Sequence, residues 1–120
     1  LPLSLRRQRQ MCIRDRRIAA AAAAENAALR GDDAWGPVGL VLGATVAAEA
    51  DRLGLDLPAL GGPLLAPGFG AQGATARGMR ADFGTAWPPG LAASSRGILS
   101  AGPSVASLVD TIEENRAALR

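Results

Sequence analysis

The fold is decided by the stretch GPLLAPGFGAQG, residues 62–73, in which a short apolar run leads directly into a glycine-rich loop. The apolar run predicts a buried strand over Pro63–Ala66, and the pair Pro67-Gly68 closes it. GFGAQG is a literal G-x-G-x-x-G, and between a strand and a helix this motif alone suggests a dinucleotide-binding loop. The stretch therefore predicts a strand, a loop with a candidate ligand site, and a helix.

The dinucleotide interpretation requires an acidic residue about twenty positions further on, which would hold the ribose. Asp82 is too close, and no Asp or Glu lies between Phe83 and Val109. Pro67 also stiffens a turn that the dinucleotide loop leaves to glycine. A glycine-rich turn without any ligand remains an alternative.

The same strand-then-helix pattern repeats on both sides of this stretch. Upstream, PVGLVLGA (residues 37–44) is a continuous apolar run, as expected of a strand buried on both faces. Downstream, GLAAS (residues 90–94) is a weaker strand candidate. Apolar spacing and helix breakers predict four helices. The first two are Arg17–Arg30, ended by Gly31, and a helix around Val46, Ala50 and Leu53, ended by Gly54. The other two are Thr75–Phe83 and a helix around Val105, Leu108, Val109 and Ile112.

A helix followed by three βα units is an α/β architecture with a parallel sheet. Three strands cannot close a barrel. The chain is therefore expected to be either half of a small doubly wound domain or the last part of a TIM (β/α)8 barrel.

SSRGIL, residues 94–99, is a second loop with anion-binding chemistry. The planar guanidinium of Arg96 can bind two phosphate oxygens at once. Taken alone, however, Arg96 is better interpreted as a buried arginine with a structural role. Two such loops after consecutive strands match the place where (β/α)8 barrels bind phosphate, after strands seven and eight.

Composition excludes several mechanisms. All thirteen basic residues are Arg, so the chain has no lysine for a Schiff base or a Walker motif and no histidine for a base or a metal site. No run of apolar residues reaches the length of a membrane span. The formal charge of +2 arises near the N-terminus, because the sequence from residue 18 onward contains seven Arg and ten acidic residues and so carries a net negative charge.

The N-terminal RRQRQMCIRDRR, residues 6–17, could be a nucleic-acid arm or the start of a signal peptide. A third interpretation is more specific: back-translated, residues 6–16 match one reading frame of a transposase-type sequencing adapter. We therefore expect residues 1–16 to be an artefact outside the fold, and residues 17–120 to be a fragment of a longer protein. Cys12 would then not belong to the protein, whose remaining sequence has no cysteine.

GLVLGAT, LLAPGFGAQGA and SSRGIL, in this order and spacing, resemble the C-terminal third of the orotidine 5′-phosphate decarboxylases, in the bacterial branch with a GAQG loop. The resemblance covers residues 17–120. It implies that Val38–Gly43, Pro63–Ala66 and Leu91–Ser94 are strands six, seven and eight of a TIM barrel.

The resemblance also implies a phosphate site made by Gln72, Gly73, Ser95 and Arg96, beside a substrate pocket formed by Pro67, Gly68 and Phe69. The glycines are expected to adopt positive φ and to let the backbone approach the ligand. Phe69 departs from the smaller aliphatic residue usual in the family, and Ala74 stands where a further glycine is common. Neither departure removes a phosphate ligand.

The family converts orotidine 5′-phosphate to UMP and CO2 without metal or cofactor, using an alternating Lys-Asp-Lys-Asp array on earlier strands. By this resemblance the protein is a cytoplasmic enzyme of pyrimidine biosynthesis that acts on a small molecule, binds neither nucleic acid nor membrane, and forms a homodimer when intact. No catalytic residue lies in this chain, so the fragment alone is expected to be inactive. Two alternatives stay open: a fragment of another phosphate-binding (β/α)8 enzyme, and a non-catalytic alanine-rich structural domain.

Overall fold

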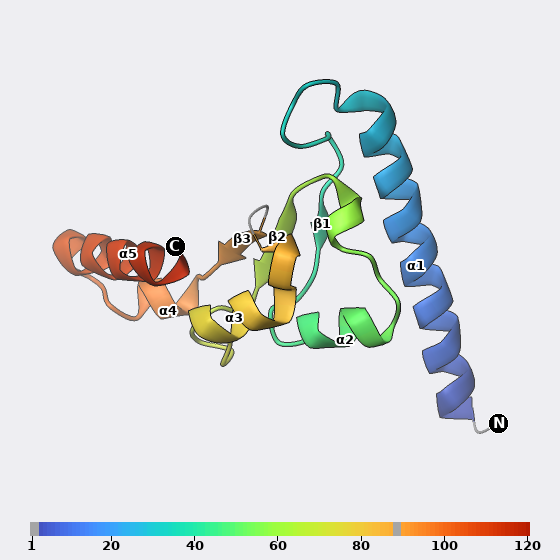
Figure 1. Cartoon of the computed structure of the whole chain (residues 1–120). Coiled ribbons are helices and arrows are strands. Elements are labelled where there is room, and N and C mark those ends of the chain that lie inside the picture. Colours follow the sequence, from blue (N-terminus) through green and yellow to red (C-terminus); the bar gives the residue numbers. More distant parts are fainter. Residues whose placement is uncertain (1–2, 88–89) are drawn as a thin grey trace.

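A three-stranded parallel sheet forms the centre of the computed structural model, which describes residues 3–87 and 90–120. Strands β1 (Leu40–Val41), β2 (Leu64–Pro67) and β3 (Gly90–Ala93) lie in the order β1-β2-β3. In Figure 1, helix α1 stands at the β1 end of the sheet, and helices α4 and α5 lie at the β3 end. The expected parallel βα order is confirmed.

The strand boundaries differ from the prediction mainly in β1. Strands β2 and β3 each lie within one residue of the predicted ranges, whereas β1 is much shorter than the predicted 38–43. Its hydrogen-bonding pattern nevertheless continues: the N–H groups of Leu40, Leu42 and Ala44 donate to the carbonyls of Pro63, Leu65 and Pro67 over 2.8–3.0 Å. Strand β1 is thus the shortest of the three, although its pairing with β2 extends beyond Leu40–Val41.

The helices follow the predicted rhythm, with short 3₁₀ turns between them. They are α1 (Leu3–Leu29), α2 (Ala47–Arg52), η1 (Pro58–Leu60), α3 (Ala76–Phe83), η2 (Gly84–Ala86), α4 (Arg96–Leu99) and α5 (Val105–Leu119). Helix α1 begins well before the predicted Arg17, because no proline or glycine interrupts residues 3–29. Thr75 caps α3, its hydroxyl accepting a hydrogen bond from the Gly78 N–H at 3.1 Å.

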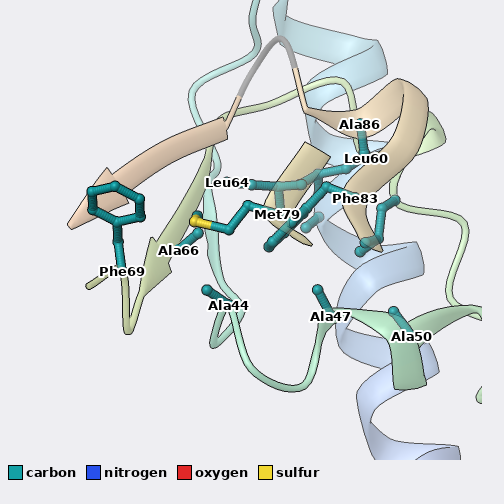
Figure 2. Close-up of a cluster of buried hydrophobic side chains, with 12 residues drawn as sticks. Ala44, Ala47, Ala50, Leu60, Leu64, Ala66, Phe69, Met79, Phe83 and Ala86 are labelled. Atoms are coloured by element: carbon teal, nitrogen blue, oxygen red, sulfur yellow. The ribbon is translucent and has the colours of Figure 1, made fainter. Parts of the chain in front are cut away.

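The core is small and rich in alanine, and it lies on one face of the sheet (Figure 2). Its largest fully buried apolar side chains are Leu60, Leu64 and Met79. Along β2 the side chains alternate: Leu64 and Ala66 are fully buried, whereas Leu65 is 40% exposed. Leu65 pairs in register with Val41 and Leu91, which are also exposed, so these three side chains form an apolar row on the other face of the sheet.

This row corrects the prediction that the strand within residues 37–44 is buried on both faces. Val41 is 69% exposed. The apolar run predicts a strand that is suited to burial on two sides, but within the described ranges the buried core covers one face only.

A buried asparagine joins α1 to the sheet. The Asn26 amide donates to the carbonyls of Val38 and Leu60, and its oxygen accepts the Val38 N–H, each over 2.8 Å. Gly36 and Gly62 lie so close that a Cβ at either position would overlap the Asn26 side chain. Helix α1 is thereby fixed to the chain just before β1 and to η1.

Candidate anion-binding site

The two predicted anion-binding loops follow neighbouring strands at the same edge of the sheet. The glycine loop, residues 68–74, begins directly after β2, and Ser94 and Ser95 join β3 to α4. Since β2 and β3 are parallel and in register from Leu64↔Gly90 to Pro67↔Ala93, their carboxyl ends lie side by side. The carboxyl edge of a parallel sheet is where α/β proteins bind ligands.

The glycine loop has the backbone expected of it. Gly68, Gly70 and Gly73 have φ angles of +113°, +74° and +96°, which other residues rarely adopt. The loop closes on itself, because the Gly70 N–H donates to the Ala74 carbonyl and the Gly73 N–H donates to the Gly70 carbonyl, both over 2.9 Å. A Cβ on Gly73 would meet no atom within 4 Å, so this part of the loop faces open space.

The glycine loop lies against the turn between β3 and α4. A Cβ built on Gly97 would lie 2.9 Å from the Ser94 Oγ and 3.8 Å from the Ala71 backbone nitrogen. A Cβ on Gly70 would lie 3.9 Å from the same Oγ. Ser94 therefore lies at the junction of the two loops. Because Gly70 and Gly97 have no Cβ, the backbone of each loop can approach the Ser94 hydroxyl closely.

The four residues expected to bind phosphate are all exposed: Gln72, Gly73, Ser95 and Arg96. The Gln72 side chain bends back over its own loop, with Oε1 3.5 Å from the position of a Cβ on Gly68. Among the side chains that the structure describes, none forms an ion pair with Arg96, so its positive charge is available to an anion. The Ser95 carbonyl accepts the N–H groups of Ile98 and Leu99, which starts α4.

The three residues expected in the substrate pocket lie deeper. Pro67 is half-buried, and its carbonyl accepts the Ala44 N–H at 2.8 Å. Gly68 is buried, and the Phe69 ring belongs to the hydrophobic core with 8% of the residue exposed (Figure 2). An aromatic ring in this loop thus anchors the loop to the core, and its contact with a substrate stays a prediction.

Ser94 is the residue that sequence reasoning did not single out. Its Oγ is buried and has no hydrogen-bond partner among the residues that the structure describes, whereas the predicted Ser95 is exposed. The pair SS pointed to this position, but the sequence alone did not reveal which of the two hydroxyls lies between the loops.

Other candidate features lie away from this edge. A hollow of about 350 Å³ between α1, β1 and α2 is lined mainly by apolar side chains and contains none of the predicted phosphate ligands. The described side chains bring together no cluster of three His, Cys, Asp or Glu residues able to hold a metal ion. Nor does any helix within the described ranges combine the length and the apolar character of a membrane span.

Comparison with known proteins gives a consistent result. The chain is 56% identical over 73 residues to an orotidine 5′-phosphate decarboxylase of Salinispora arenicola, a match that covers 61% of the chain and 25% of that enzyme. It is 45% identical over 86 residues to the enzyme of the same name from Streptomyces coelicolor, covering 72% of the chain and 28% of the relative. No family model matches. The chain thus spans about a quarter of the length of these curated relatives.

A solved structure agrees with the sequence relatives. A crystal structure described as an orotidine 5′-phosphate decarboxylase of Streptomyces avermitilis superposes with a TM-score of 0.71 at 40% sequence identity. The superposition covers 87% of this chain and 35% of that one. The similarity therefore extends to the arrangement of the elements in space.

Proposed function

The chain is homologous to orotidine 5′-phosphate decarboxylases over the part of their length that it spans, and on this premise we propose that it is the C-terminal part of such an enzyme. Its strands β1, β2 and β3 would be strands six, seven and eight of a (β/α)8 barrel. Residues 17–120 would belong to that barrel, and residues 1–16 would lie outside it.

The apolar row of Val41, Leu65 and Leu91 supports the barrel. A closed barrel turns one face of its sheet toward helices and the other toward its own packed interior. Here one face already carries the core, and the opposite face presents this aligned apolar row to solvent. The missing strands of a barrel would bury it.

The observation that carries the function is the junction of the glycine loop with the β3–α4 turn. It brings backbone of both loops to one edge of the sheet, next to the exposed residues Arg96 and Gln72. We assign to this edge the 5′-phosphate of orotidine 5′-phosphate. The Arg96 guanidinium would pair with the phosphate oxygens, and the Gln72 amide would fold over them.

The intact enzyme would convert orotidine 5′-phosphate to UMP and CO2 in cytoplasmic pyrimidine biosynthesis. Binding energy from the phosphate, which is remote from the reacting carbon, can be used to hold loops closed in the transition state. This segment would supply that binding energy, and earlier strands would supply the proton donor, because the chain contains no lysine.

The phosphate assignment is tested by titrating the 120-residue chain with inorganic phosphate and with UMP, followed by NMR of the backbone amides. We expect the amides of the glycine loop and of residues 94–97 to shift together. Arg96→Gln should weaken binding at least about tenfold, since hydrogen bonds to charged groups contribute roughly 1.5–3 kcal/mol.

Arg80→Gln is the matched control, because Arg80 is also an exposed arginine but lies on α3 outside the two loops. It should leave phosphate affinity unchanged. Shifts confined to one loop, or equal losses in the two variants, would refute the shared phosphate site.

A further inference from the structure

Ser94 carries the one side-chain polar atom that is buried without a partner in the described part of the chain. A buried hydroxyl in an apolar environment loses its hydrogen bonds to water, so proteins seldom leave one unpaired without a functional reason. The position of Ser94 indicates that this reason is ligand binding, because the residue lies where the glycine loop meets the β3–α4 turn.

The Ser94 hydroxyl lies beside both loops. Gly97 approaches from its own turn and Gly70 from the glycine loop. Among the described atoms outside the chain neighbours of Gly70, only the Ser94 Oγ lies within 4 Å of a Cβ built on Gly70. Among the described atoms, the Ser94 Oγ is thus the hydrogen-bonding group next to Gly70 on this side. A ligand group that took the place of this part of the loop would find Ser94 as its hydrogen-bonding partner.

The glycine loop that covers the hydroxyl is held mainly by bonds within itself. Its hydrogen bonds join Gly70 to Ala74, Gly73 to Gly70 and Ala74 to Gly68. Over the residues that the structure describes, no hydrogen bond ties Gly70–Ala74 to the turn between β3 and α4. The loop can therefore shift away from Ser94 without breaking a bond to that turn.

We propose that Ser94 is a further ligand of the anion site, whose hydroxyl donates a hydrogen bond to the bound phosphate when the glycine loop shifts. This inference rests on the proposed function and adds to it a residue beyond Gln72, Gly73, Ser95 and Arg96. The hydroxyl is left unpaired in the ligand-free chain and gains its partner from the ligand.

This role has a signature that a structural serine lacks. Ser94→Ala removes an unpaired buried hydroxyl, so the melting temperature of the ligand-free chain should be unchanged or higher. The same variant should bind inorganic phosphate about tenfold more weakly, because a hydrogen bond to a charged oxygen is lost. A structural hydroxyl would instead lower the melting temperature on removal.

The experiment measures melting by circular dichroism and phosphate affinity by NMR titration for wild type, Ser94→Ala and Ser104→Ala. Ser104 is an exposed serine that precedes α5, and its side chain makes no capping bond, so its variant should match wild type in both measurements. A lower melting temperature for Ser94→Ala, or an unchanged phosphate affinity, overturns the proposal.

Arg96→Gln, measured alongside, separates the two hypotheses. If it abolishes phosphate binding while Ser94→Ala does not affect it, the phosphate site stands and the role of Ser94 is wrong. If wild type itself binds no phosphate, the proposed function fails, and the assignment of Ser94 fails with it.

Discussion

At the scale of single residues, Asn26 shows how much one side chain can contribute to this small fold. It is 1% exposed, and both ends of its amide are bonded to backbone groups of the segments around β1 and η1. Burying an amide costs free energy unless its polar atoms are hydrogen-bonded. When the amide is removed, its former backbone partners are left without hydrogen bonds, which also costs free energy. Asn26 therefore couples α1 to the chain just before β1 and to η1.

Replacing Asn26 with alanine should destabilise the chain by about 3 kcal/mol or more, because the Val38 N–H and two carbonyls, which are buried or partly buried, lose their partner. Urea unfolding measures this loss. Asn115→Ala on α5 is the control. Within the described part of the chain the Asn115 side chain makes no hydrogen bond, so this substitution should change stability by less than about 1 kcal/mol. Equal effects of the two substitutions would refute the coupling role.

At the scale of elements, the strands and α3 were predictable because their signals are local. A short apolar run between breakers specifies a parallel strand, and Thr75 specifies the start of α3 through its own cap. Helix α1 was predicted only in part. Helix propensity continues through residues 3–16, yet the first buried side chain on α1 is Ala22 within the residues whose burial is described, 13–29.

Deleting residues 1–16 should therefore leave the fold intact. The packed part of α1, with Ala22 and Asn26, is retained, so the melting temperature should fall by no more than about 4 °C, the shift that 1 kcal/mol gives in a domain of this size.

Deleting residues 1–26 is the contrasting variant for α1, and it should abolish cooperative unfolding because it removes both buried residues. If the shorter deletion also unfolds the chain, residues 1–16 belong to the fold.

At the scale of the whole molecule, the two loops proposed to bind phosphate lie at one edge of a sheet that carries a buried core on one face only within the described ranges. Its apolar row of Val41, Leu65 and Leu91 is exposed, and β1 has one strand partner in the described ranges. Helix α5 is tied to the rest through the Trp87 indole, which donates to the Leu119 carbonyl at 3.4 Å. In Figure 1, α1 and α5 lie at opposite ends of the sheet, α1 beside β1 and α5 beyond β3.

The chain alone should bind phosphate without decarboxylating orotidine 5′-phosphate. It contains no lysine, and lysine is the proton donor that the resemblance to the decarboxylases implies. The absorbance change of orotidine 5′-phosphate measures turnover, with the full-length enzyme of Salinispora arenicola as positive control. Turnover above the uncatalysed rate would contradict the assignment of the chemistry to earlier strands.

The sequence by itself determined the order of the elements, the parallel sheet and the loops that end β2 and β3, because apolar runs, caps and glycines act over a few residues. Parallel strands then place those loops at one edge, so the meeting of the glycine loop with the Arg96 turn followed from the pattern. Tertiary structure decided which face of the sheet is covered, why Asn26 is buried and which serine lies between the loops. These outcomes depend on contacts between segments far apart in the sequence, such as the bond between Asn26 and Leu60, which are 34 residues apart, and no local pattern encodes such contacts.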